Sequence, residues 1–204
     1  MSLFSYENFI DPVLRNIRQI TPEFSCIKAG DEVLDVCCGT GAQVIEYGKH
    51  GILATGIDRE QSMLSVALKN KEQQNLLNTS FYLADATALP FEDDRFDYVS
   101  ISFGLHDKER NIRNKIVSEM KRVVKQEGSL IFIDYQVPLP NNVWAMLART
   151  IEFIAGGSHY YGFRDYIDNG GLKSVLKNHQ LFEEKTGYFK SGIVVISKAK
   201  LYKE

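Results

Sequence analysis

Three aspartates in the first half of the chain stand at or near the ends of apolar runs. Asp35 lies within the run 33–36, and Asp58 and Asp85 directly follow the next two runs. The carboxyl ends of parallel strands share one edge of a sheet, so we expect these carboxylates to line one crevice. Three carboxylates around a small site repel one another unless the ligand brings hydroxyls, amines or positive charge. The pattern predicts a ligand of that kind.

A glycine turn, Gly39-Thr40-Gly41, separates the first apolar run from a helical pattern at 42–49. Strand, glycine turn and helix together present backbone N–H groups to a ligand. A dinucleotide fingerprint requires a third glycine, and Val44 stands at that position. Asp35 would also lie close to a pyrophosphate, whereas it suits a ligand with an ammonium group. The turn argues against a nicotinamide-dependent oxidoreductase, which stays as an alternative.

Apolar runs and amphipathic patterns alternate along most of the chain. The predicted strands are 32–36, 52–57, 81–84, 96–102 and 129–134, followed by a hairpin of 181–189 and 192–199. The predicted helices are 6–20, ended by Thr21-Pro22, then 42–49, 61–75, a segment from 112 ended by Glu127-Gly128, and 171–178. This order predicts an α/β fold with a doubly wound, mostly parallel seven-stranded Rossmann-like sheet and an antiparallel terminal strand.

The 204 residues suit a single domain, and residues 135–171 interrupt its rhythm. This segment contains a helix-like stretch at 143–154, a break at Gly156-Gly157 and an aromatic cluster. It is too long for an ordinary connection, so we expect a substrate-side insertion or lid. His159, Tyr160 and Tyr161 are candidates for an aromatic substrate pocket, and packing beneath the insertion is the alternative.

Composition and charge exclude several classes of function. The net charge is -2 and no long basic tract occurs, so a nucleic acid is not expected as a partner. The cysteines, Cys26, Cys37 and Cys38, form no C-x-x-C pair, so we expect neither a disulfide framework nor a metal site. No apolar run approaches the roughly 18 residues of a membrane span, and the first apolar pattern lacks a basic leader. These features predict a cytoplasmic protein; its oligomeric state stays open.

Ordered motifs over residues 30–135 resemble those of the class I S-adenosylmethionine-dependent methyltransferases. The similarity is to the small-molecule branch that includes ubiquinone and menaquinone biosynthesis methyltransferases. It is carried by the stretches 33–41, 56–58, 84–91, 96–99 and 119–130. The resemblance implies S-adenosyl-L-methionine as cofactor and methyl transfer to a C, O or N nucleophile of a small molecule. A non-catalytic scaffold or regulator that holds this cofactor or its demethylated product is the alternative.

The resemblance also implies roles for the residues of the first two motifs. Gly39 and Gly41 would let the backbone approach the amino-acid part of the cofactor, with Cys37 beside them. Asp35 would recognise the ammonium group and Asp58 the two ribose hydroxyls. One departure is Cys37-Cys38, where the family often has a glycine before its first cysteine. Both residues are small, so we expect little effect on binding.

The later motifs are expected to complete the pocket. Arg59 and Met63 would flank the adenine. The Asp85 carboxylate would accept a hydrogen bond from the exocyclic amine of the adenine, and the Ala86 N–H would donate one to a ring nitrogen. For Asp58 and Asp85, a purely structural role as helix N-caps is the alternative.

The loop after the fourth predicted strand would close the pocket near the transferable methyl. Ser102 and Phe103 are expected there, and His106 is the candidate for a catalytic base or a substrate contact. The alternative for His106 is a loop histidine that bonds Asp107 or solvent. No base is needed unless the acceptor must lose a proton.

Overall fold

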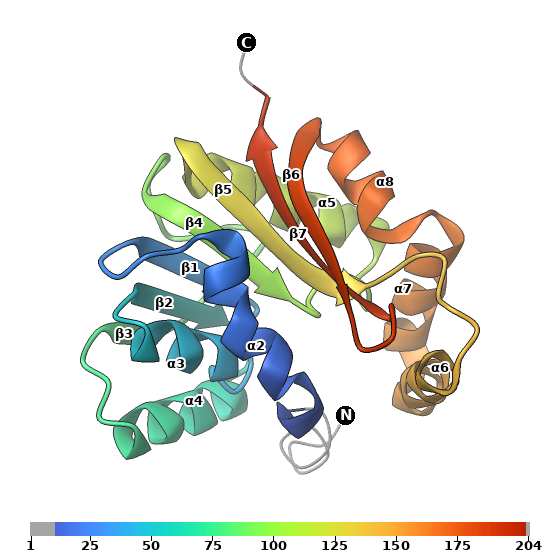
Figure 1. Cartoon of the computed structure of the whole chain (residues 1–204), viewed down its shortest axis with the longest axis horizontal. Coiled ribbons are helices and arrows are strands. Elements are labelled where there is room, and N and C mark those ends of the chain that lie inside the picture. The colour runs from blue at the N-terminus through green and yellow to red at the C-terminus, as the bar shows by residue number, and fades with distance from the viewer. Residues whose placement is uncertain (1–10, 203–204) are drawn as a thin grey trace.

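A seven-stranded sheet in the order β3-β2-β1-β4-β5-β7-β6 forms the centre of the molecule, and helices cover both faces (Figure 1). The computed structural model describes residues 11–202. The strands are β1 (Glu32–Val36), β2 (Leu53–Asp58), β3 (Thr79–Leu83), β4 (Phe96–Ser102), β5 (Val124–Tyr135), β6 (Leu181–Phe189) and β7 (Val194–Leu201). The helices are α2 (Asp11–Ser25), α3 (Ala42–Lys49), α4 (Gln61–Gln73), α5 (Arg110–Val123), α6 (Val143–Ala155), α7 (Gly157–Asp168) and α8 (Gly171–Asn178).

The sheet is parallel except at β7. Strand β1 pairs in parallel with β2 and β4, and β7 pairs antiparallel with both β5 and β6. The predicted fold class and the antiparallel strand beside β5 are therefore confirmed. The sheet order reverses between β1 and β4, and such a reversal opens a crevice at the carboxyl ends of the strands.

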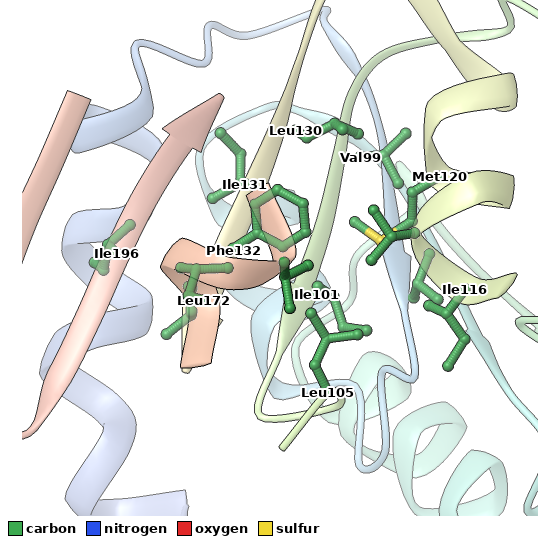
Figure 2. Close-up of a cluster of buried hydrophobic side chains, with 14 of the residues drawn as sticks. Val99, Ile101, Leu105, Ile116, Met120, Leu130, Ile131, Phe132, Leu172 and Ile196 are labelled. Atoms are coloured by element: carbon green, nitrogen blue, oxygen red, sulfur yellow. The ribbon is translucent and has the colours of Figure 1, made fainter. Parts of the chain in front are cut away.

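Helix α5 shows how the sequence pattern builds the core on one face of the sheet. Its buried residues Ile116, Met120 and Val123 recur at spacings of four and three, which places them on one side of the helix. Figure 2 shows Ile116 and Met120 beside Val99 and Ile101 of β4. All of these side chains are almost fully buried, so this packing fixes the end of β4 from which the site loop departs.

Helix α3 packs closely on the sheet although the third fingerprint glycine is absent. Val44, which occupies that position, is fully buried. It fits because Gly56 of β2 has no side chain: a Cβ there would lie 2.9 Å from a methyl carbon of Val44. The close approach that a dinucleotide fold gains from its helix glycine is supplied here by a glycine of the neighbouring strand.

The prediction that the first helix ends at Thr21-Pro22 is wrong. Helix α2 continues through Pro22 to Ser25, while the predicted residues 6–10 lie outside the described part of the chain. Pro22 has no N–H to donate to the Arg18 carbonyl, but Gln43 Nε2 donates to that oxygen at 3.4 Å. A tertiary partner thus replaces the hydrogen bond that proline removes.

The prediction that the helix from residue 112 ends at Glu127-Gly128 is also wrong. Helix α5 ends at Val123, and β5 begins at the next residue instead of at 129. The N–H groups of Asp94 and Arg95 donate to the last helix carbonyls, those of Arg122 and Val123. Gly128 serves strand pairing instead, because a Cβ there would lie 2.6 Å from the Asp97 carbonyl oxygen.

The aromatic cluster after Gly156 is helical. The predicted break is confirmed, since Gly156 has a φ of 65° and separates α6 from α7. The residues that follow, for which the sequence analysis predicted no secondary structure, form α7. Helix α7 lies against α6, α8 and α5, and in Figure 1 α6 and α7 lie beyond the carboxyl ends of β4 and β5.

Replacing Gly41 by alanine should destabilise the fold by about 2–4 kcal/mol. Gly41 has a φ of 74°, and a Cβ there would lie 2.6 Å from the Phe81 ring and 2.8 Å from Ala67. The control is Gly30→Ala, because Gly30 has a φ of 89° but nothing within 4 Å of its Cβ position. The Gly30→Ala substitution should lower the free energy of unfolding by only about 1–2 kcal/mol, the strain of alanine in a left-handed backbone conformation. Urea unfolding measures both, and equal losses would contradict the packing argument.

Candidate functional site

A cavity of about 890 Å³ opens at the carboxyl ends of β1 to β4 and reaches α6 and α7. It brings together most of the residues that the sequence predicts as cofactor contacts. Those in its wall are Cys37, Gly39, Asp58, Arg59, Met63, Asp85, Ala86, Ser102 and Phe103. The predicted convergence of strand ends on one crevice is therefore present in the structure.

Asp58 fixes the glycine turn to the end of β2. Its Oδ2 accepts a hydrogen bond from the Gly39 N–H at 2.8 Å, and its Oδ1 accepts from the Glu60 N–H at 3.0 Å. Asp58 is not a helix N-cap, because α4 begins after Glu60. The carboxylate is thus held in one orientation at the cavity wall, with the turn directly beside it.

Asp85 lies at the next strand end along the sheet. Its Oδ1 accepts hydrogen bonds from both the N–H and the hydroxyl of Thr87, each at 2.8 Å. These hydrogen bonds lower the pKa of Asp85, so the carboxylate is ionised at neutral pH. No helix follows within the described chain before β4, so the N-cap alternative does not explain this residue.

Asp35 lies beneath the turn and does not reach the cavity wall. Its side chain is almost fully buried, and its Oδ1 accepts a hydrogen bond from the Ser100 hydroxyl at 2.6 Å. Burial raises the pKa of Asp35 to about 7, and the Ser100 hydrogen bond opposes this shift. Gly41 is also outside the wall, since its Cα faces Phe81 and Ala67. The proposed contact of Asp35 with an ammonium group stays a prediction.

The floor of the cavity is built from backbone in the left-handed region. Cys37 and Phe103, which follow β1 and β4, have φ values of 58° and 52°, and Gly39 has a φ of 52°. Non-glycine residues in this conformation gather at functional sites. A Cβ on Gly39 would meet nothing within 4 Å, so the space above the turn is free for a ligand.

The cavity wall fits a nucleoside with an amino-acid tail. Among the described residues, the buried hydroxyl of Ser102 has no hydrogen-bond partner, so a polar ligand group is needed to satisfy it. The open space at Gly39 admits an extended tail, and the Asp58 carboxylate suits a pair of hydroxyls. The residues present therefore fit S-adenosylmethionine.

The other end of the cavity carries an ionised cluster around His106. His106 is buried; its Nδ1 lies 2.7 Å from Asp134 Oδ1, and its Nε2 lies 3.5 Å from Glu152 Oε1. Burial lowers the pKa of His106, but the two carboxylates outweigh it and hold the pKa well above its usual value. The expected alternative partner, Asp107, is not the one found. His106 is thus fixed between two carboxylates.

Glu152 of α6 joins this cluster to α7. Its Oε1 accepts a hydrogen bond from the Tyr135 hydroxyl at 2.9 Å, and its Oε2 lies 3.0 Å from His159 Nδ1. Burial raises the pKa of Glu152, but His106 and His159 more than compensate and hold it far below its usual value. His159 also approaches Asp107, with 3.6 Å between Nε2 and Oδ2.

The predicted aromatic contacts divide between the cavity and the outside. His159 lines the cavity, whereas Tyr160 packs edge-on against Phe153 and Tyr161 is 75% exposed. Neither tyrosine lies in the cavity wall, because α7 turns successive side chains by about 100°.

Sequence reasoning named His106 and His159 as candidates at this end of the cavity but missed the other residues around them. Glu152 carried a signal, since it is the only carboxylate in the apolar helix α6. Asp134 carried another, because it stands near the end of a predicted strand as Asp35 does. The residues of α6 in the apolar wall gave no signal in the sequence beyond their helical spacing. They are Trp144, Leu147, Ala148 and Ile151.

Replacing Asp35 by asparagine should flatten the pH dependence of stability. The folded pKa of about 7 exceeds the ordinary value of 3.8, so between these pH values the folded state binds more protons than the unfolded state. The contribution of Asp35 to wild-type stability should therefore be fully present below pH 4 and be lost as the pH rises to about 7. The contribution from Asp35 should be on the order of 4 kcal/mol. Denaturant unfolding at several pH values checks this, and parallel profiles for wild type and variant would contradict it.

Known proteins are similar in sequence to the part of this chain that holds the strand-end residues Asp58 and Asp85. Residues 33–128 match the family model described as a methyltransferase domain. The demethylmenaquinone methyltransferase of Staphylococcus haemolyticus is 39% identical over 118 residues, 55% of this chain and 46% of that protein. That of Listeria welshimeri is 38% identical over 127 residues, 59% of this chain and 52% of that protein. The chain thus spans about half the length of these curated relatives.

Solved structures extend the similarity in fold to nearly the whole chain. A SAM-dependent methyltransferase from Aquifex aeolicus aligns with a TM-score of 0.71 at 18% identity, covering 98% of both chains. The PH0226 protein from Pyrococcus horikoshii aligns with a TM-score of 0.74 at 17% identity, covering 99% of this chain and 100% of that one. These structures show the fold alone. Residues 33–128, which hold most of the motifs singled out in the sequence, are thus similar to a methyltransferase domain.

Proposed function

We propose that this protein transfers the methyl group of S-adenosylmethionine to a nucleophilic atom of a small molecule. The observation that carries the proposal is one continuous cavity. It joins the methyltransferase motif residues, such as Asp58 and Ser102, to an apolar and ionised wall contributed by residues after 135. Such a cavity has room for a cofactor at one end and an acceptor at the other.

The cofactor end is assigned to the strand-end residues. The backbone at Gly39 would contact the amino-acid part, and Asp58 the ribose hydroxyls. Arg59 and Met63 would flank the adenine, with Asp85 and Ala86 at its polar edge. When bound, the cofactor supplies a methyl group on a sulfonium sulfur, so the chain's own residues need only position the acceptor and exclude water.

The acceptor end is assigned to residues 135–171, as a substrate-side insertion. Helix α6 presents Trp144, Leu147 and Ile151 to the cavity, which favours a partly apolar or aromatic acceptor. The relatives from Staphylococcus and Listeria are named for demethylmenaquinone, so a quinone-type acceptor is one candidate. The family model ends at residue 128, before this wall begins. The acceptor therefore needs its own test.

His106 is the residue of the acceptor end that the sequence predicts as catalytic. It lines the cavity together with Glu152 and His159, close to Phe103 at the cofactor end. Its role as a base stays a prediction. A non-catalytic scaffold would have no use for an acceptor compartment, and the open volume of the cavity favours turnover instead.

None of the helices described between residues 11 and 202 is long and apolar enough to cross a bilayer.

Replacing Asp58 by alanine should weaken binding of S-adenosylhomocysteine on the order of 100-fold. The variant loses a charged acceptor for the ribose hydroxyls and the anchor of the Gly39 N–H. Isothermal titration calorimetry measures the affinity. The matched control is Glu72→Ala, because Glu72 is an exposed carboxylate of α4 outside the cavity wall.

An unchanged affinity in the Asp58 variant would overturn the cofactor assignment. Thermal unfolding of the wild type tests the nicotinamide alternative. S-adenosylhomocysteine should raise the thermal midpoint of the wild type, whereas NAD should not, because only a ligand of the folded state stabilises it. Stabilisation by NAD alone would replace the proposal.

A further inference from the structure

Three side chains from three separate elements converge at the acceptor end of the cavity. His106 comes from the loop after β4, Glu152 from α6 and His159 from α7. One nitrogen of each histidine and one oxygen of the carboxylate all lie within 4.8 Å of one another. The side chains of Glu152 and His106 are each 5% exposed, whereas that of His159 is 33% exposed.

The closest pair in this group is not joined by a hydrogen bond. Glu152 Oε2 and His159 Nδ1 lie 3.0 Å apart, yet both atoms are buried without a hydrogen-bond partner among residues 11–202. Buried polar atoms rarely stay unsatisfied. The two atoms form an ion pair when His159 is protonated, and a cation that takes the place of that proton could contact both.

The outer contacts of the two histidines also point to a metal. Asp134 Oδ1 lies 2.7 Å from His106 Nδ1, and Asp107 Oδ2 lies 3.6 Å from His159 Nε2. Histidines that ligate metals usually direct their second ring nitrogen to a carboxylate, which fixes the tautomer and orients the ring. A metal ion at His106 Nε2 would replace the proton that this nitrogen directs toward Glu152, while Nδ1 would keep its proton toward Asp134.

We propose that His106, Glu152 and His159 bind one divalent transition-metal ion, with Zn²⁺ the best match. Two histidine nitrogens and one carboxylate oxygen are a ligand set of catalytic zinc sites. Ligands at about 2.1 Å in a tetrahedron lie about 3.4 Å apart. Here each histidine faces a different oxygen of the carboxylate, with 3.5 Å between His106 Nε2 and Glu152 Oε1 and 3.0 Å between His159 Nδ1 and Glu152 Oε2. One atom from each of the three residues lies within 4.8 Å of the others, so the side chains would close slightly around an ion.

A metal here would give the cavity a second specificity element. All three ligands line the cavity, so the remaining coordination position faces the acceptor compartment. It would hold an acceptor through an oxygen or nitrogen donor atom next to the methylated position. The role in methylation rests on the proposed function, whereas metal binding does not. His106 then acts as a ligand in place of the base, and the expectation of no metal site, drawn from the cysteines, is replaced.

The site can be tested with Zn²⁺ alone. The full chain, stripped with a chelator and dialysed, is titrated with ZnCl₂ by calorimetry, and bound zinc is counted by elemental analysis. We expect one ion per chain, and at least a 100-fold loss of affinity in Glu152→Gln and in His159→Asn. The control is His50→Asn, because His50 pairs with Glu46 on the surface at 3.9 Å without a third ligand. This control should bind as the wild type does.

The two variants keep the test decisive. Glu152 is buried and its variant can lose stability, whereas His159 is partly exposed, so circular dichroism should show His159→Asn folded. A Co²⁺ absorption spectrum typical of a four- or five-coordinate site should appear in the wild type and vanish in His159→Asn. No stoichiometric Zn²⁺ binding by the wild type, or equal affinity in His159→Asn, would overturn the site. Binding of S-adenosylhomocysteine to the stripped protein, measured alongside, separates this outcome from failure of the proposed function.

Discussion

The hydrogen bond between Asp58 Oδ2 and the Gly39 N–H connects the parts of this molecule that its cofactor site requires. It links the carboxyl end of β2 to the turn after the neighbouring strand β1. Because the bond holds the carboxylate at a fixed place beside an open backbone cradle, the site is organised before any ligand enters. Preorganised polar groups bind without paying for their own rearrangement.

The fold and the cofactor end were largely predictable because their signals are local. A strand, a glycine turn and a helix are contiguous, and the register of parallel strands then brings Asp58 and Asp85 to one edge. The errors in the fold came from distant partners. Gln43 supplies the hydrogen bond that lets α2 run through Pro22, and the position of Gly128 is explained only by the neighbouring Asp97 backbone.

The sequence predicted residues 135–171, His106 and His159 at the substrate side, but the convergence of both histidines on Glu152 was not predictable, for the same physical reason. Glu152 and His159 lie on two helices, and His106 lies in a loop far earlier in the chain. Their convergence depends on how α6 and α7 dock on the sheet, which no spacing in the sequence records. The orientation of Tyr160 and Tyr161 away from the cavity has the same origin. Two signals were available, Glu152 as a lone carboxylate in an apolar helix and Asp134 near the end of a predicted strand.

The cavity thus has two ends of different origin, one built by the motif residues, where we propose that the cofactor binds, and one built by α6 and α7, where we propose that the acceptor binds. The most direct test of this account is a crystal structure with S-adenosylhomocysteine bound. We predict that the Asp58 carboxylate contacts both ribose hydroxyls and that the sulfur lies between Ser102 and the group of His106, Glu152 and His159. A nucleoside bound elsewhere, or one whose sulfur points away from that group, would contradict it.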